Sequence, residues 1–234
     1  MNDAGSAFEI VSWVAVSLGI LSAILVTLDL PRRRPQMMYV MNLVWPINAL
    51  WAGPLGIWMY WQLGRTGPLS TDQPAAKSVH HDMDMPPRPF WQKVVAGTLH
   101  CGSGCTLADL IGPFIAGATA FAVFGSLVFG EWTIDYIIAL IIGVTFQYMA
   151  LAPMLNERGL RIWWRALKVD FLSLTAWQVG MYGWMALVIF VFIGHLRPEH
   201  IEFWFMMQVA MACGFLTSYP MNWLLIKNGV KTAM

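Results

Sequence analysis

The sequence predicts an all-α polytopic membrane protein with about six transmembrane helices and a broken third span. Of the 234 residues, 58% are hydrophobic and only 12% are charged, whereas soluble domains carry about 25% charged residues. Several apolar stretches reach the roughly 20 residues that a helix needs to cross a bilayer. Spans are expected at residues 8–29, 38–62, 106–129, 133–154, 171–194 and 202–226. These helices would form one helical membrane domain over residues 1–234.

The N-terminal segment lacks the features of a cleavable signal peptide. It carries Asp3 and Glu9 and no basic residue ahead of the first apolar stretch, which is also longer than the apolar core of a signal. We therefore expect the spans themselves to direct insertion into the membrane. The net charge of +1 and the lack of a basic tail give no indication of nucleic acid as a partner.

The first two spans carry little chemistry of their own. The second contains Asn42 and Asn48, and amides inside spans usually form hydrogen bonds between helices, worth about 0.6 kcal/mol each. We expect these two spans to serve packing.

A polar loop over residues 64–90 follows the second span. It is rich in Pro, Gly, Ser and Thr and has no hydrophobic period, so we expect a flexible segment. Two imidazoles and two thioethers lie near its end, at His80, His81, Met83 and Met85. Thioethers favour Cu(I), and imidazoles accept Cu(II) or Zn, so this tract predicts weak metal capture with copper first. The alternative is a polar linker with no ligand.

The segment at residues 100–105, HCGSGC, holds the most reactive chemistry of the chain. Its two glycines each cost about 1 kcal/mol in a helix relative to alanine. We therefore expect a break here and a new helix starting near Cys105 or Thr106, with Thr106 as an N-terminal cap. Asp109 lies one helical turn beyond Cys105, and a carboxylate inside a span needs a partner.

This segment predicts a transition-metal site. His100, Cys101 and Cys105 offer imidazole and thiol ligands for copper or zinc, and Asp109 could supply a fourth ligand. Two alternatives stay open: a redox-active thiol pair, and small residues that pack a tight helix turn. The Cys-x-x-x-Cys spacing is less specific than paired Cys-x-x-Cys motifs, and the odd count of three cysteines indicates reduced thiols.

The later spans contain further polar and sulfur-containing residues. Gln147 in the fourth span and Asp170 at the start of the fifth are either hydrogen-bond partners between helices or part of an ion path. Residues 156–169 read as a separate basic interfacial helix between these spans. Two methionine pairs share helix faces, and they are either core packing or a thioether path: Met181 with Met185, and Met207 with Met211.

Several motifs together resemble a bacterial membrane-protein family catalogued only as a domain of unknown function. They cover residues 45–60, 100–109, 146–154, 170–175 and 219–224, and the most specific is H-C-x-x-x-C-T-x-x-D at residues 100–109. The resemblance spans nearly all of residues 37–234. It implies several transmembrane helices, a location in the bacterial inner (cytoplasmic) membrane and a role in metal handling. It also implies an acidic residue at position 178, where this chain has Gln178.

We expect a membrane metal-handling protein, which transports a soft transition-metal cation, copper first. The alternative is a non-transporting structural or redox accessory subunit of a larger membrane complex. Expected partners are the lipid bilayer, the metal ion, and either a second copy of the chain or such a complex. No nucleophile–base arrangement or phosphate-binding loop is present in the sequence, so we expect no hydrolytic or ATP-driven activity from this chain alone.

Overall fold

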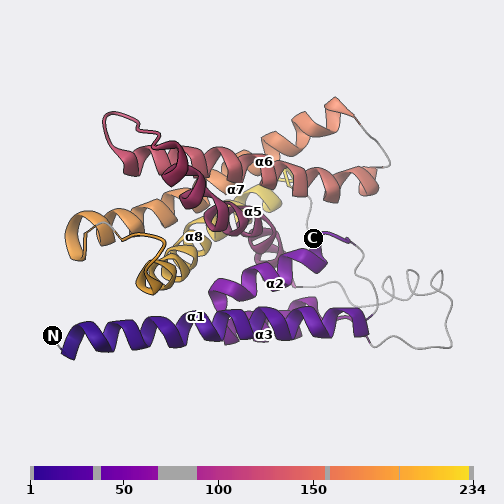
Figure 1. The fold of residues 1–234 in the computed structure, drawn as a ribbon. Helices are drawn as coiled ribbons and strands as arrows, with labels where there is room; N and C mark the ends of the chain where they lie inside the picture. The colour runs from indigo at the N-terminus through magenta and orange to yellow at the C-terminus, as the bar shows by residue number, and fades with distance from the viewer. Residues whose placement is uncertain (1–2, 34–37, 68–88, 156–158, 195, 232–234) are drawn as a thin grey trace.

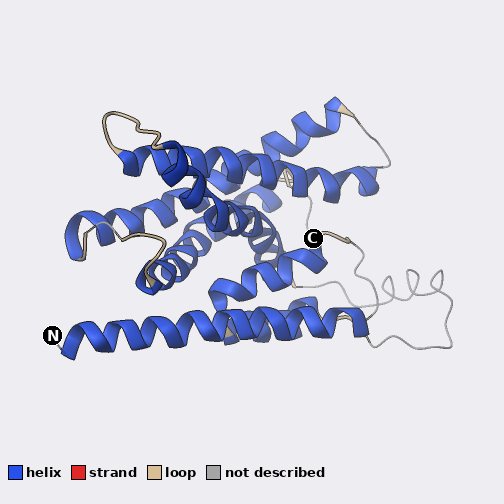
Figure 2. Ribbon diagram, viewed as in Figure 1, coloured by secondary structure: helices blue, strands red, loops and turns tan. Residues whose placement is uncertain are grey.

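The computed structural model describes residues 3–33, 38–67, 89–155, 159–194 and 196–231, and these are almost entirely helical (Figure 1, Figure 2). The α-helices are α1 (Asp3–Asp29), α2 (Met41–Ala52), α3 (Pro54–Met59), α5 (Phe90–Thr119), α6 (Leu127–Leu155), α7 (Leu160–Leu187) and α8 (Ile201–Lys227). A short 3-10 turn follows α1, and π-helical turns at Tyr60–Gly64 and Val188–Phe192 extend α3 and α7. No β-strand forms within the described ranges.

Five helical segments are long and apolar enough to cross a membrane. They are Gly5–Arg32, Phe90–Thr119, Leu127–Ala152, Leu160–Phe192 and Ile201–Lys227. All expose large apolar side chains on their outer faces, among them Leu25, Phe114 and Leu216, as lipid-facing helices do. The predicted all-α polytopic fold is confirmed.

The second expected span, residues 38–62, is the one that is broken. It consists of α2 and α3, which meet at Gly53. Gly53 has φ 55° and ψ −134°, a conformation that residues with a Cβ atom rarely adopt. Pro54 then begins α3, where its missing N–H leaves no helical hydrogen bond unmade.

Helix α5 forms the centre of the bundle. In the ribbon view it lies between α6 and α7 on one side and α2 on the other, and α8 passes beside it (Figure 1). The apolar stretch of α5 is 83% buried, against 22–39% for the other four candidate spans. Residues of α5 are therefore in the best position to form a site inside the membrane.

The predicted break at Gly102 and Gly104 is wrong, because α5 continues from Phe90 to Thr119 without interruption. Both glycines serve close packing. A Cβ atom at Gly102 would overlap the ring of Trp177 in α7, and one at Gly104 would lie 3.0 Å from the backbone of Gly143 in α6. Thr106 does not cap a new helix either, since its hydroxyl donates to the carbonyl of Gly102 one turn earlier at 2.9 Å.

The basic segment before the fifth span is continuous with that span, and its place at the membrane interface stays a prediction. Residues 160–169, which belong to the expected helix at 156–169, form the first turns of α7. Two of these residues, Ile162 and Ala166, are buried against Val144 and Leu151 of α6. This packing holds the beginning of α7 against the end of α6.

Candidate functional site

The buried polar side chains of α5–α8 form two centres inside the bundle. The first, named the thiol centre, consists of Cys101, Asp170, Ser173, Asn222 and Lys231. The second, named the carboxyl centre, consists of Asp109, Glu131, Asp135 and Tyr182. Both depend on α5, and Cys101 and Asp109 lie eight residues apart on it, which is about 12 Å along a helix axis.

The thiol of Cys101 holds the thiol centre together. It donates to Oδ1 of Asp170 at 2.9 Å and lies 2.9 Å from the hydroxyl oxygen of Ser173. The ammonium of Lys231 donates to Sγ of Cys101 at 2.8 Å. The sulfur atom of Cys101 therefore lies between the carboxylate of Asp170 and the ammonium of Lys231. The opposite charges of these two groups compensate each other across the sulfur, without a direct contact.

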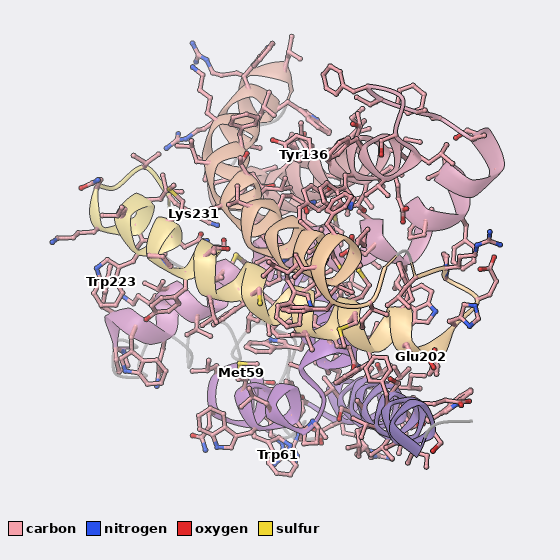
Figure 3. All side chains as sticks on the ribbon, turned by 90° about the vertical axis from the view of Figure 1, so that its left-hand side faces the viewer. Met59, Trp61, Tyr136, Glu202, Trp223 and Lys231 are labelled. Atoms are coloured by element: carbon pink, nitrogen blue, oxygen red, sulfur yellow. The ribbon has the colours of Figure 1, made fainter. Side chains whose placement is uncertain are left out.

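Lys231 reaches this position from the tail that follows α8 (Figure 3). Its ammonium also donates to the carbonyl oxygen of Gly97 at 3.1 Å and to Oδ1 of Asn222 at 2.7 Å. The amide of Asn222 is held in turn by the carbonyl and hydroxyl oxygens of Ser218, both at 3.0 Å. With three acceptors, the lysine has a complete set of hydrogen bonds although its residue is only 1% exposed.

The carboxyl centre has no such compensation. Asp109 of α5 and Asp135 of α6 line the same small cavity of about 30 Å³, together with the half-buried Glu131. Tyr182 donates to Oδ2 of Asp135 at 2.8 Å. Oδ2 of Asp109 and Oδ1 of Asp135 are buried without a hydrogen-bond partner, and in the described part of the chain no lysine or arginine forms a salt bridge with either residue. Buried polar atoms that lack a partner indicate a place for water or an ion.

Packing brings the helices close together at this centre. A Cβ atom at Gly112 of α5 would lie 3.1 Å from Oδ1 of Asp135, so the glycine lets α6 approach. Ala116, one turn after Gly112 on α5, is also buried. The side chain that α6 places beside Asp109 is thus a second carboxyl group and not a cation.

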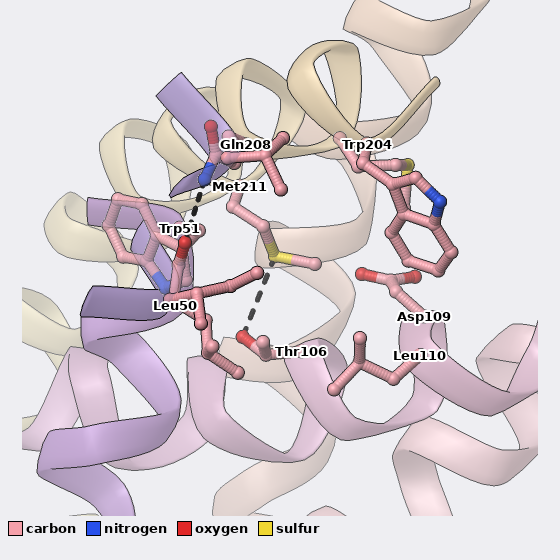
Figure 4. Close-up of a pocket in the computed structure, with 11 residues that line it drawn as sticks. Leu50, Trp51, Thr106, Asp109, Leu110, Trp204, Gln208 and Met211 are labelled. Carbon is pink, nitrogen blue, oxygen red and sulfur yellow. Dashed lines mark hydrogen bonds between the residues drawn. The ribbon is translucent and has the colours of Figure 1, made fainter. Parts of the chain in front are cut away.

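Thioethers and a second cavity surround the carboxyl centre. Met181, Met185 and Met207 line the cavity that holds Asp109 and Asp135. On another side, Asp109 borders an apolar cavity of about 290 Å³ between α1, α2, α5 and α8, and its carboxyl group points into it beneath Trp204 (Figure 4). Asp109 of α5 and Met207 of α8 therefore line both cavities.

Cys105 connects the two centres. It lies one turn after Cys101 and one turn before Asp109, so the three side chains follow one face of α5. Cys105 is fully buried and packs in an apolar cluster that includes Ala139 of α6 and Leu174 of α7. We name the succession of Cys101, Cys105, Asp109, Asp135 and Glu131 the thiol–carboxyl line.

Metal binding by His100, Cys101 and Cys105 stays a prediction, and the structure does not gather the three side chains into one group. Within the described ranges, no group of three or more His, Cys, Asp or Glu residues is arranged to hold a metal ion. In a continuous helix His100 points about 100° away from Cys101; its ring lies 6.3 Å from that of Phe146 in α6. Both ring nitrogens of His100 are buried without a partner.

The other predicted site residues have different outcomes. Asp170 is fully buried in the thiol centre, while Gln147 is buried in α6 and its Oε1 has no partner. His80, His81, Met83 and Met85 lie outside the described residues, so metal capture by this tract stays a prediction. All three cysteines, Cys101, Cys105 and Cys213, are free thiols. Cys105 lies in an apolar cluster, one helical turn before Asp109 on α5.

Sequence reasoning missed Glu131, Asp135 and Lys231. A signal was present for Asp135, since an acidic residue within an apolar span is costly in hydrocarbon and indicates a function. Glu131 lies one turn earlier and shares its face. No sequence signal distinguishes Lys231 from an ordinary polar residue near a chain end, because only the turn after α8 brings it to Cys101.

Comparisons with known proteins identify one family. No curated protein and no solved structure matches the chain. A family model described as "Domain of unknown function (DUF4396)" matches residues 90–231, which contain both centres but not the motif expected at residues 45–60. Since this match covers more than half of the 234 residues, the chain belongs to the DUF4396 family of unknown function.

Proposed function

We propose that the protein transports a soft transition-metal cation across a membrane, with Cu(I) as the first candidate. The observation that carries the proposal is the thiol–carboxyl line through the central helix: two thiols on α5 lead to the carboxyl groups of Asp109 and Asp135. Sulfur ligands select Cu(I) among the metals available to proteins. Within the membrane, ionisable residues of this kind typically mark the path of an ion.

The spacing of these groups suits conduction better than storage. A resident metal needs three or four ligands in fixed geometry, and the described residues offer no such cage. Conduction requires several weaker positions, each of which an ion can enter and leave. Each position along the thiol–carboxyl line offers an ion two ligand groups, either a thiol and a carboxylate or two carboxylates. Three thioethers also line the cavity of the carboxyl centre.

The line has one end near the membrane surface and one end closed by the chain itself. Glu131 is half-buried in the first turns of α6, so the acidic end has a side chain that water can reach. At the other end Lys231 covers Cys101. An ion that passes the whole line would therefore require the tail after α8 to move.

Flux measurements in proteoliposomes test this function. We expect Cu(I) or Ag(I) uptake above that of empty vesicles, and at least a tenfold lower rate for Cys105→Ser, because a hydroxyl binds soft cations far more weakly than a thiol. Cys213→Ser is the matched control, since Cys213 is a free thiol on α8 and takes no part in the line; its rate should equal that of the wild type.

Two outcomes would contradict the proposal. One is an absence of flux in the wild type, which would favour the accessory-subunit alternative. The other is equal flux for Cys105→Ser and Cys213→Ser, which would remove the line from the path.

A further inference from the structure

The ammonium of Lys231 occupies a position that is built like a cation site. Three acceptor atoms surround it: Sγ of Cys101 at 2.8 Å, Oδ1 of Asn222 at 2.7 Å and the carbonyl oxygen of Gly97 at 3.1 Å. They come from two helices, α5 and α8, that are fixed without the lysine. A sulfur, an amide oxygen and a backbone carbonyl are all ligands that metal cations accept.

The charge of the site also fits a cation. Asp170 is fully buried and accepts a hydrogen bond from Cys101 at 2.9 Å, and its other oxygen, Oδ2, has no partner. Within the described ranges, Lys231 is the one cation in hydrogen-bond contact with this centre. A buried carboxylate without a positive neighbour is strongly destabilising, so the centre needs one positive charge.

Lys231 lies four residues after the end of α8, beyond a turn of the backbone. The chain leaves α8 after Lys227, turns at Gly229 with φ 68° and returns the backbone N–H of Val230 and Lys231 to the carbonyl of Leu225 at 2.9 and 3.1 Å. Val230 is half exposed. Withdrawal of the lysine therefore requires a local change of four residues and leaves the bundle helices in place.

We propose that the thiol centre is a binding site for a soft monovalent cation and that Lys231 is its tethered, displaceable occupant. An incoming cation takes the position of the ammonium beside Cys101, and Lys231 moves to the surface with its proton. The inference rests on the proposed function, because it describes how one end of the thiol–carboxyl line is opened and closed. It adds to the proposed function a cation-binding site and an internal competitor for that site, the ammonium of Lys231.

Silver binding by purified protein tests the inference. Ag⁺ is soft and monovalent, and Cys105→Ser/Cys213→Ser protein leaves Cys101 as the one remaining cysteine. In this background we expect Lys231→Ala to bind one Ag⁺ per chain at least tenfold more tightly than the parent. Addition of Cys101→Ser should abolish that gain. Lys227→Ala is the matched control, because Lys227 is exposed at the end of α8, and it should bind like the parent.

A second measurement keeps the test decisive if Lys231→Ala does not fold. In the wild-type chain, an amine-reactive label should modify Lys231 slowly and faster once Ag⁺ is added, whereas labelling of Lys227 should not change. The inference is overturned if folded Lys231→Ala binds no additional Ag⁺, or if Ag⁺ leaves the labelling of Lys231 unchanged.

These outcomes are separable from those of the flux experiment. If wild-type flux depends on Cys105 and Lys231→Ala gains no site, the transport function stands and the tethered occupant fails. If Lys231→Ala gains the site and no flux is measured, the occupant stands and transport fails.

Discussion

The two polar centres of this bundle solve the same electrostatic problem in opposite ways. In the thiol centre, Asp170 is compensated by Lys231 through the thiol of Cys101, with contacts of 2.8 and 2.9 Å. In the carboxyl centre, Asp109 and Asp135 share a cavity, and each has a buried oxygen without a partner. The first centre supplies its own cation, whereas in the second no described lysine or arginine forms a salt bridge with the carboxyl groups.

The difference separates a buried carboxylate that has a counter-ion from buried carboxylates that have none among the described residues. A compensated buried charge contributes to a defined structure, and removal of one partner is costly. Uncompensated carboxylates are costly as they stand, so a protein keeps them where an ion or proton passes. Replacement of a carboxylate should therefore destabilise the protein in the thiol centre and leave it unchanged or more stable in the carboxyl centre.

The largest effect is expected for Asp170→Ala. This change leaves the ammonium of Lys231 buried without a negative neighbour, and we expect the free energy of unfolding to fall by about 3–5 kcal/mol. Denaturant titration in detergent micelles, followed by circular dichroism, measures the change. The double variant Asp170→Ala/Lys231→Ala should lose less than the sum of the two single variants. Additive losses would show that the two charges are not coupled.

A smaller loss is expected for Gly102→Ala, between the two centres on α5. The added methyl group would overlap the ring of Trp177, and overpacking of this kind costs about 1–3 kcal/mol. Gly117→Ala is the control, because a Cβ atom there meets nothing within 4 Å; it should be neutral or stabilising. Equal unfolding midpoints for both variants would argue against the close approach of α5 and α7.

Tyr182→Phe should cost about 1 kcal/mol, the net worth of a hydrogen bond. The hydroxyl donates to Oδ2 of Asp135 at 2.8 Å and lies 2.8 Å from the carbonyl oxygen of Trp132. Loss of the hydroxyl leaves Oδ2 of Asp135 without this hydrogen bond. The same unfolding titration applies, and a loss as large as that of Asp170→Ala would place a compensated network in the carboxyl centre as well.

The smallest effect, with the opposite sign, is expected for Asp109→Asn. The amide removes one of two neighbouring carboxylates, so the free energy of unfolding should stay the same or rise by up to about 1 kcal/mol. Cation flux should fall at least tenfold in the same variant. A clear destabilisation together with normal flux would reverse the roles assigned to the two centres.

Much of the fold follows from the sequence, because bilayer thickness and apolar run length determine which segments can span. The break was misplaced for a physical reason. Glycine has a low intrinsic helix propensity and so suggests a break. Gly102 and Gly104 instead leave space for Trp177 and Gly143, which are distant in sequence and pack against α5. At Gly53, which precedes Pro54, the local backbone conformation does determine the break, and α2 ends there.

The candidate site was predictable in part. Cys101, Cys105 and Asp109 share a helix face, which their spacing alone indicates. Asp170 was identified as an intramembrane carboxylate, but its contact with Cys101 depends on how α7 crosses α5. Lys231 could not have been assigned, because its position results from the turn that follows α8. His100 shows the converse: adjacency in sequence to Cys101 places it on a different side of the helix.

Silver stoichiometry of the otherwise unmodified chain tests the central contrast most directly. Equilibrium dialysis of Cys101→Ser and Cys105→Ser against excess Ag⁺ compares a thiol already in contact with a cation to one beside uncompensated carboxylates. We predict that the tighter Ag⁺ of the wild type is lost in Cys105→Ser and kept in Cys101→Ser. Loss in Cys101→Ser with retention in Cys105→Ser would contradict the account.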